Sequence, residues 1–130
     1  MEKVEALVKE CKTIMSQQRR MQRRSRNLSV SAAMLDNGTY VYGVNIPRSG
    51  IICSEMVALG NSLLASPESD MLYIVTLLMH GDETEVVLPC GNCRQNLLYV
   101  YPNVSVVRFN NGLYQLEKIR DLLPLAYERK

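Results

Sequence analysis

Residues 71–79, with the sequence MLYIVTLLM, form an almost unbroken apolar run. Apolar and polar residues do not alternate along it, as they do in a strand that has one face in water. A strand without this alternation is buried on both faces, which is typical of a parallel or mixed sheet covered by helices on both sides. The run therefore predicts a layered α/β fold.

Helices and strands alternate around this central run. Residues 2–16 place apolar side chains such as Leu7, Cys11 and Met15 at helical spacing, which predicts a helix with one buried stripe. The QQRRMQRRSR segment after it is expected to be a fraying helix end and a loop. Further helices are predicted over 54–65, 91–99 and 116–123, and further strands over 27–35, 39–44, 104–109 and 113–115.

The order of these elements predicts a three-layer α/β/α sandwich with a five-stranded mixed sheet. Residues 71–109 form a strand, a helix and a strand, and we expect them to make a right-handed crossover. Asn-Gly turns at 36–38 and 110–112 predict two hairpins, whereas HGDETE at 80–85 is expected to be a polar loop. With 130 residues and no repeat or linker, the chain is expected to form a single domain, 1–130.

The composition limits the environment of the protein. No apolar run reaches the roughly eighteen residues of a membrane span, and the opening MEKVEALVKECK lacks the apolar core of a secretory signal. We therefore expect no membrane association, a cytoplasmic location and reduced cysteines. The net charge of +2 favours no particular partner.

A basic segment holds five arginines without an intervening acid: Arg19, Arg20, Arg23, Arg24 and Arg26. It is compatible with a solvated helix end, a contact with a neighbouring subunit, or an anionic partner such as a nucleotide phosphate or RNA. No aromatic residue lies between these arginines, so they do not resemble a stacking platform for single-stranded nucleic acid. We do not expect nucleic acid to be a partner.

Two short motifs begin predicted helices: Cys53-Ser54-Glu55 and Pro89-Cys90-Gly91-Asn92-Cys93. In a reduced protein, a CxxC motif indicates metal or redox chemistry. Three thiolates suit Zn²⁺, and catalytic zinc sites keep a fourth position open for water or substrate. We predict that Cys53, Cys90 and Cys93 bind zinc, and that Glu55, two residues after Cys53, can stand beside the ion without binding it.

The alternatives for these cysteines are a structural zinc site and buried free thiols. A structural site usually has four protein ligands, and the sequence offers no obvious fourth ligand. His80, the single histidine, is expected to be an exposed loop residue and would be the first candidate for that fourth position. Cys11 lies on the apolar stripe of the first helix and is expected to be buried.

The combination of C-x-E with P-C-x-x-C is the signature of zinc deaminases that act on nucleobases. The chain resembles the cytidine deaminase family, especially its blasticidin-S deaminase branch, from about Leu28 to Tyr127. The resembling segments are SVSAAML, GVN, CSE, PCGNCRQ and IRDLLPLAY. The resemblance implies a homo-oligomer, a tetramer or a dimer, in which neighbouring subunits complete each pocket.

The resemblance also implies a reaction, the hydrolytic deamination of a small-molecule cytosine nucleoside or a close analogue by zinc-activated hydroxide. Glu55 would carry protons from the water to the ring nitrogen and to the departing ammonia. Asn45 would contact the ribose and Tyr127 would cover the base, and Ser54 is predicted to be a third substrate-binding residue. Arg94 is a candidate to offset the negative charge of the thiolates.

Two positions depart from the typical cytidine deaminase pattern. Pro47 stands where a glutamate contacts the ribose, and Met56 stands where an arginine often follows the catalytic glutamate. The missing carboxylate at Pro47, together with Arg48 and the arginines at 19–26, predicts that a charged or modified cytosine nucleoside is a better substrate than cytidine. The alternatives are a blasticidin-S-type aminoacyl-nucleoside deaminase and a non-catalytic, zinc-stabilised RNA-binding module.

Overall fold

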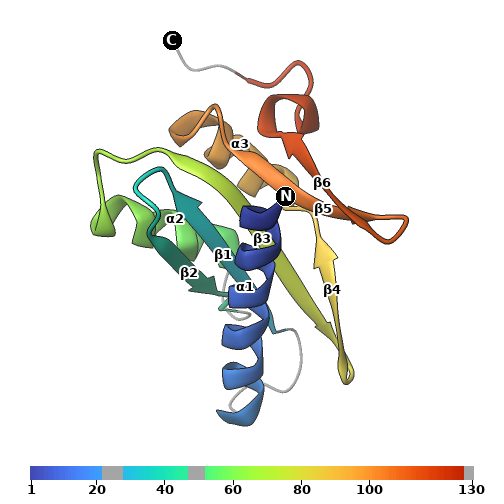
Figure 1. The fold of residues 1–130 in the computed structure, drawn as a ribbon. Helices are drawn as coiled ribbons and strands as arrows, with labels where there is room; N and C mark the ends of the chain where they lie inside the picture. Colours follow the sequence, from blue (N-terminus) through green and yellow to red (C-terminus); the bar gives the residue numbers. More distant parts are fainter. Residues whose placement is uncertain (22–27, 47–51, 128–130) are drawn as a thin grey trace.

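The computed structural model describes residues 1–21, 28–46 and 52–127 (Figure 1). Its helices are α1 (Glu2–Met21), α2 (Ser54–Ala65) and α3 (Gly91–Val100), followed by a short 3₁₀ helix, η1 (Ile119–Leu122). Its strands are β1 (Ser29–Leu35), β2 (Tyr40–Val44), β3 (Met71–His80), β4 (Glu83–Val87), β5 (Ser105–Asn110) and β6 (Leu113–Lys118).

The strands form one mixed sheet in the order β2-β1-β3-β5-β6, and β4 pairs with β3 beside this path. The pair of β3 and β5 is parallel, as the predicted crossover requires. The other pairs are antiparallel. The sheet therefore has six strands, one more than the sequence predicted.

The additional strand is β4, which we had predicted to be part of a polar loop. Gly81, with φ of +58°, and Asp82 form a two-residue turn that returns the chain along β3, and His80 pairs with Glu83. Three of the five residues of β4 are exposed, so its charged side chains remain in water and its sequence lacks an apolar face. The Gly-Asp dipeptide was the local indication of this hairpin.

The two Asn-Gly hairpins are confirmed. Gly38 has φ of +86°, and Asn111 and Gly112 both have positive φ, as a type I′ turn requires. The helix predicted over 116–123 is wrong: β6 continues pairing with β5 as far as Lys118, and η1 alone is helical. The first helix is also longer than predicted, because Gln and Arg are good helix formers and Arg19 and Arg20 suit the negative end of its dipole.

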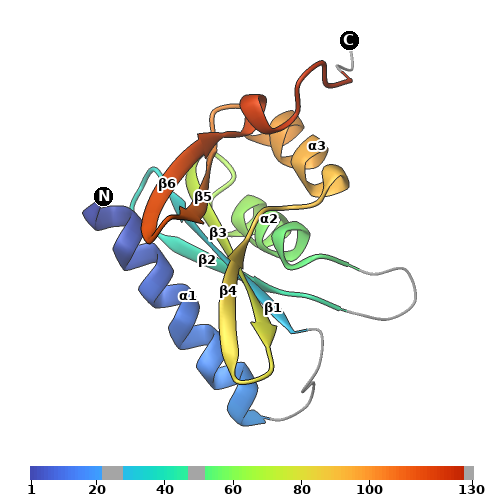
Figure 2. The ribbon, with the colours of Figure 1, turned by 90° about the vertical axis from the view of Figure 1, so that its right-hand side faces the viewer.

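The three layers are confirmed: α1 covers one face of the sheet, and α2 and α3 cover the other (Figure 2). Two apolar clusters fill the space between the layers. The cluster on the α1 side includes Leu7, Cys11, Val30, Val75 and Leu77. The cluster on the α2 and α3 side includes Ala33, Leu35, Ile74, Leu97 and Ile119. Strand β3 contributes to both clusters, which confirms that it is buried on both faces.

Only part of the basic segment falls within the described residues. Arg19 donates hydrogen bonds to Asp82, at 3.1 Å to the backbone oxygen and 3.3 Å to Oδ1, and so ties the end of α1 to the β3–β4 turn. The positions of Arg23, Arg24 and Arg26 lie outside the described residues, as do Pro47 and Arg48. Among the described helices, none combines the length and the apolar character needed to span a bilayer.

Candidate metal centre

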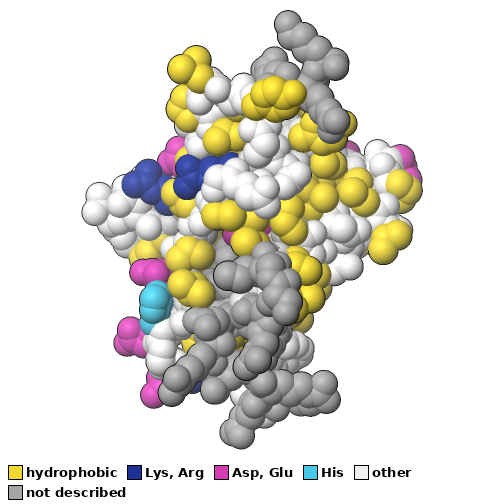
Figure 3. Space-filling view, turned by 180° about the vertical axis from the view of Figure 1, so that it is seen from behind, with side chains coloured by type: hydrophobic (Ala, Val, Ile, Leu, Met, Phe, Trp, Pro, Cys, Tyr) yellow, Lys and Arg dark blue, Asp and Glu magenta, His cyan; other side chains and the backbone are white. Residues whose placement is uncertain are grey.

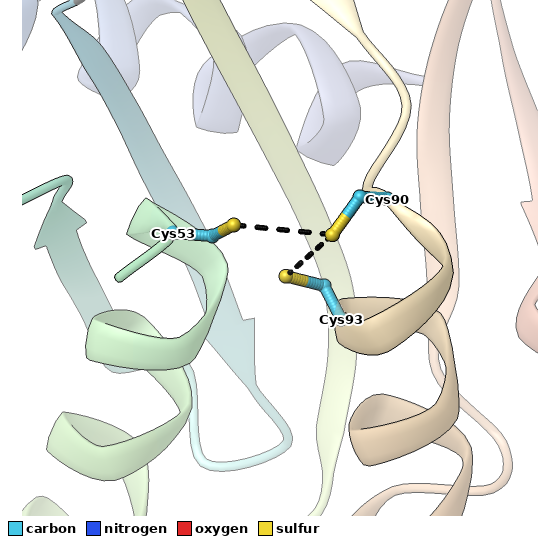
Figure 4. Close-up of side chains that lie close together, drawn as sticks. All are labelled: Cys53, Cys90 and Cys93. Atoms are coloured by element: carbon cyan, nitrogen blue, oxygen red, sulfur yellow. Dashed lines mark hydrogen bonds between the residues drawn. The ribbon is translucent and has the colours of Figure 1, made fainter. Parts of the chain in front are cut away.

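The first turns of α2 and α3 bring three cysteines together (Figure 4). Cys53 is the N-cap residue of α2 and Cys90 is the N-cap residue of α3, and both have extended backbone angles. Neither side chain caps its own helix with a hydrogen bond. The side chains of Cys53 and Cys90 point toward each other from the two helices, and the sulfur of Cys93, in the first turn of α3, lies close to that of Cys90 (Figure 4).

The spacing of the three sulfur atoms fits one metal ion. Cys53 Sγ lies 3.9 Å from Cys90 Sγ, which lies 3.5 Å from Cys93 Sγ, and all three atoms lie within 4.8 Å of one another. Around a tetrahedral zinc with Zn–S bonds of about 2.3 Å, two sulfur ligands are about 3.8 Å apart. All three cysteines are free thiols. The arrangement fits zinc with three protein ligands and an open fourth position.

No fourth ligand joins this cluster in the described part of the chain. His80 is half-exposed at the end of β3 and its Nε2 lies 2.9 Å from Oε1 of Glu85. This confirms that His80 is an exposed residue, although it ends a strand and does not lie in a loop. A four-ligand structural site therefore receives no support from the described residues.

The surroundings of the three thiols differ. The backbone N–H of Cys93, at the positive end of α3, lowers the pKa of the Cys90 thiol. Burial raises the pKa of Cys53 and of Cys93, and the nearby charge of Glu55 raises both further. Cys90 is therefore the thiol that ionises first, and a bound cation would favour the thiolate form of all three.

Glu55 lies in the first turn of α2 and is only 5% exposed. Its Oε2 accepts a hydrogen bond of 3.0 Å from the hydroxyl of Thr76 in β3. Glu55 thus lies in the first turn of the helix that Cys53 begins, two residues after this predicted ligand.

The predicted substrate-binding residues have different environments. Asn45 follows β2 and is buried, and its Oδ1 accepts a 2.9 Å hydrogen bond from the backbone N–H of Ser29. The hydroxyl of Ser54 is buried against β1, where it bonds to Ser29 and Ser31, so this side chain is turned away from the solvent. Tyr127 is 74% exposed, and its backbone oxygen accepts a hydrogen bond from Gln95 of α3.

Two further expectations concern Arg94 and Cys11. Arg94 donates to the backbone oxygens of Pro89 and Leu122, at 2.7 and 2.9 Å. Arg94 therefore links the segment before α3 to the end of η1, and its guanidinium is directed to these two carbonyl groups. Cys11 is fully buried, as predicted, and its thiol donates to the backbone oxygen of Val30.

Sequence reasoning missed three residues that shape the site. Ser31 and Thr76 are polar residues inside apolar strands, and both lie behind Glu55. Gly43 of β2 lies so close to α2 that a β-carbon there would collide with the backbone of Ser54 and Ala58. A polar residue in an otherwise apolar strand is a sequence feature that could have identified the first two. Gly43 lies inside the strand predicted over 39–44, and a glycine inside a strand is a feature that could have indicated a close backbone approach.

Comparison with solved structures finds proteins of the same fold. The chain is 26% identical to the cytidine deaminase of Mycobacterium tuberculosis, with a TM-score of 0.66 over 82% of this chain and 84% of that chain. The cytidine deaminase of Bacillus anthracis has the same fold, with a TM-score of 0.74, 21% identity, and coverage of 95% of this chain and 88% of that chain.

A curated relative, the blasticidin-S deaminase of Bacillus cereus, is 32% identical over 83 residues. That match covers 60% of this chain and 59% of the relative, so the chain spans somewhat more than half of the relative's length. Residues 1–107 match the model of the family described as the cytidine and deoxycytidylate deaminase zinc-binding region. The matched range includes both cysteine motifs and Glu55, and the chain belongs to this zinc-binding deaminase family.

Proposed function

We propose that this protein is a zinc-dependent deaminase of a cytosine nucleoside or a close analogue, with Cys53, Cys90 and Cys93 as the zinc ligands and Glu55 as the catalytic residue. The observation that carries the proposal is a cluster of three thiols at two helix N-termini, with the buried carboxylate of Glu55 in the first turn of the helix that Cys53 begins. A site that serves only to stabilise a fold does not need a carboxylate at this place. The membership of the chain in a zinc-binding deaminase family supports the same conclusion.

Zinc in such a site lowers the pKa of a bound water and so supplies a nucleophile near neutral pH. The protein's own contribution is proton transfer. Glu55 accepts a proton from the attacking water, gives it to the ring nitrogen next to the reacting carbon, and then carries a second proton to the departing ammonia. Water is consumed, and the amino group of the cytosine ring is replaced by an oxygen.

Asn45 and Tyr127 are our candidates for substrate contacts. Asn45 is anchored to Ser29, which would hold its side chain in one orientation at the end of β2. The bond from Gln95 to the backbone of Tyr127 keeps the C-terminal segment beside α3, where an exposed ring is able to close over a bound base. The inward orientation of the Ser54 hydroxyl supports a contact to substrate through its backbone only.

A second candidate function is deamination of an aminoacyl nucleoside of the blasticidin-S type. It is favoured by the 32% identity with the blasticidin-S deaminase of Bacillus cereus and by Met56, which packs against the apolar cluster between α2 and the sheet. An arginine at this position would place a charge against apolar side chains. The site therefore does not use the residue after Glu55 to balance the thiolates.

We also propose that the protein is a cytoplasmic homo-oligomer. The face of the molecule opposite α1 exposes several hydrophobic side chains (Figure 3). Leu63, Leu64 and Tyr99, on α2 and α3, are 40%, 85% and 68% exposed. Contact between copies would bury such side chains. The cytoplasmic location is supported by the four free thiols, because thiols remain reduced there.

The experiment that tests the proposed function is an ammonia-release assay on zinc-loaded protein. Cytidine, deoxycytidine, cytosine, blasticidin S and the corresponding monophosphates are compared, with Glu55→Gln as the inactive control. We expect turnover of at least one compound by the wild type and none by the variant. No turnover of any compound, together with RNA binding in a gel-shift assay, would favour the non-catalytic alternative.

A further inference from the structure

A row of hydroxyl groups lies between the sheet and the first turn of α2, directly behind Glu55. Thr76 Oγ1 lies 3.0 Å from Glu55 Oε2 and 2.6 Å from Ser31 Oγ. Ser31 Oγ lies 2.8 Å from Ser54 Oγ, which lies 3.1 Å from Ser29 Oγ. Four hydroxyl groups thus connect the catalytic carboxylate with the beginning of β1.

The pairing of the strands produces this row. Ser31 of β1 lies opposite Thr76 of β3 in the antiparallel ladder, so the two side chains meet on the face that α2 covers. Ser29 lies two residues before Ser31 and therefore on the same face. Ser31 and Ser54 have no exposed surface, and Thr76 is only 4% exposed.

The hydrogen bonds of the row all have the same direction. Thr76 donates to Glu55, and each hydroxyl carries only one hydrogen. Ser31 must then supply the hydrogen for its contact with Thr76, and Ser54 the hydrogen for its contact with Ser31. Ser29 donates to Ser54 in the same sense. Such a chain is polarised toward its end, which strengthens the final bond to the carboxylate.

The row holds one carboxylate oxygen and leaves the other available. Among the described residues, the hydrogen bond to Glu55 is made to Oε2, and none is made to Oε1. Every side-chain oxygen or nitrogen of these residues that is fully shielded from solvent has a hydrogen-bond partner, so an oxygen without a partner is not fully shielded. Oε1 therefore keeps contact with solvent although the residue as a whole is 5% exposed. A carboxylate that carries protons must reach the atoms it serves, and a hydrogen bond to one of its oxygens restricts the orientation of the other.

We propose that Thr76 and Ser31 are positioning residues for Glu55: the hydroxyl chain fixes Oε2 and thereby aims Oε1 at the reacting atoms. The proposal deepens the proposed function and rests on it. Apolar residues at these two positions would fill the sheet equally well, so packing alone does not require hydroxyl groups there. Because each hydroxyl donates its one hydrogen toward Glu55, the hydrogen of Thr76 is not drawn to another acceptor and remains in the bond to Glu55.

The test compares Thr76→Val, which removes the hydroxyl and keeps the shape, with Thr76→Ser, which keeps the hydroxyl. We expect Thr76→Val to lower kcat about ten- to a hundred-fold, the loss typical of a misplaced catalytic group or a lost bond to a charge, with little change in KM. Thr76→Ser should stay close to the wild type. Ser31→Ala should lower kcat less than Thr76→Val, because Thr76 keeps its direct bond to Glu55.

Ser62→Ala is the matched control, because Ser62 is also a fully buried hydroxyl on α2 and bonds to Tyr101 and Leu59, away from Glu55. It should lower thermal stability and leave kcat unchanged. Zinc content and melting temperature are measured for every variant. Normal kcat in Thr76→Val, or an equal loss of kcat in Thr76→Ser, would overturn the proposal.

Crystal structures of the zinc-loaded wild type and Thr76→Val provide a readout that does not depend on activity. We expect one conformation of the Glu55 side chain in the wild type. In the variant we expect either a rotated side chain or two alternative conformations. If the wild type deaminates none of the tested compounds, the proposed function fails, and these structures alone then decide the positioning role. An unmoved Glu55 in Thr76→Val would overturn it.

Discussion

The sulfur atoms of Cys53 and Cys90 lie 3.9 Å apart, although 37 positions separate the two residues along the chain. Each residue is the N-cap of a helix, so the position of its sulfur follows from how α2 and α3 pack on the same face of the sheet. Changes that move either helix should therefore disturb the candidate metal centre even where they touch no ligand.

The first prediction concerns metal content. The protein should contain about one zinc per chain, and Cys53→Ser, Cys90→Ser and Cys93→Ser should each lose most of it, because two thiolates hold zinc poorly. Elemental analysis of protein purified without added metal gives the measurement. Cys11→Ala is the control: its thiol is buried on the other side of the sheet, so this variant should be less stable but fully loaded. Retention of zinc by all three serine variants would contradict the ligand assignment.

A second prediction tests the contact between β2 and α2. Gly43→Ala should lower the free energy of unfolding by about 1–3 kcal/mol, because the added methyl group collides with the backbone of Ser54 and Ala58. It should also reduce zinc content, since the collision moves the turn that carries Cys53. Urea unfolding and elemental analysis measure both effects.

Gly60 provides the matched control for this prediction. It lies on α2, and apart from its chain neighbours and the backbone of its own helix no atom lies within 4 Å of an added β-carbon. Gly60→Ala should stabilise the protein by about 0.5–1 kcal/mol, because glycine is unfavourable inside a helix. Equal stability of the wild type and Gly43→Ala would show that the close approach of β2 to α2 is not maintained in solution.

The third prediction concerns Glu55. Glu55→Gln should keep the fold and the zinc, because the amide has nearly the same shape, but turnover should fall at least about a hundred-fold without a proton carrier. Steady-state kinetics on a compound that the wild type deaminates provide the measurement. Glu83→Gln, an exposed change on β4, should retain wild-type kinetics. Comparable kcat values for Glu55→Gln and the wild type would remove Glu55 from its proposed role.

The fourth prediction concerns the reactivity of the thiols. In zinc-free protein near neutral pH, iodoacetamide should modify Cys90 first, because this thiol is exposed and its pKa is lowered by the backbone N–H of Cys93. Cys11 should remain unmodified in the folded protein, because burial raises its pKa to about 12. Mass spectrometry of peptides over time follows each cysteine.

Added zinc should protect Cys53, Cys90 and Cys93 together in the same experiment, since one ion engages all three sulfur atoms. Protection of Cys90 and Cys93 without Cys53 would indicate that the CxxC motif binds metal alone. Modification of Cys11 at a rate similar to that of Cys90 would contradict the burial of Cys11 between α1 and the sheet.

Local sequence patterns determined the layered fold and the chemistry of the site. The apolar run of β3 showed that both faces of the sheet are covered, because a strand with one wet face alternates polar and apolar residues. The Asn-Gly turns defined two hairpins, because few other residues adopt positive φ. The two cysteine motifs and Glu55 were recognisable because together they match the known signature of zinc deaminases.

The extent of strand pairing was decided only by the tertiary structure. Gly81 and Asp82 indicate the β3–β4 turn, but β4 continues to Val87 because β3 offers it an unpaired edge, and β6 continues to Lys118 because β5 remains beside it. The hydroxyl chain behind Glu55 exists because the register places Ser31 opposite Thr76, beneath Ser54 of α2. A sequence shows which residues are polar, but only the register of the strands and the packing of a helix bring three such residues within hydrogen-bond distance of one another.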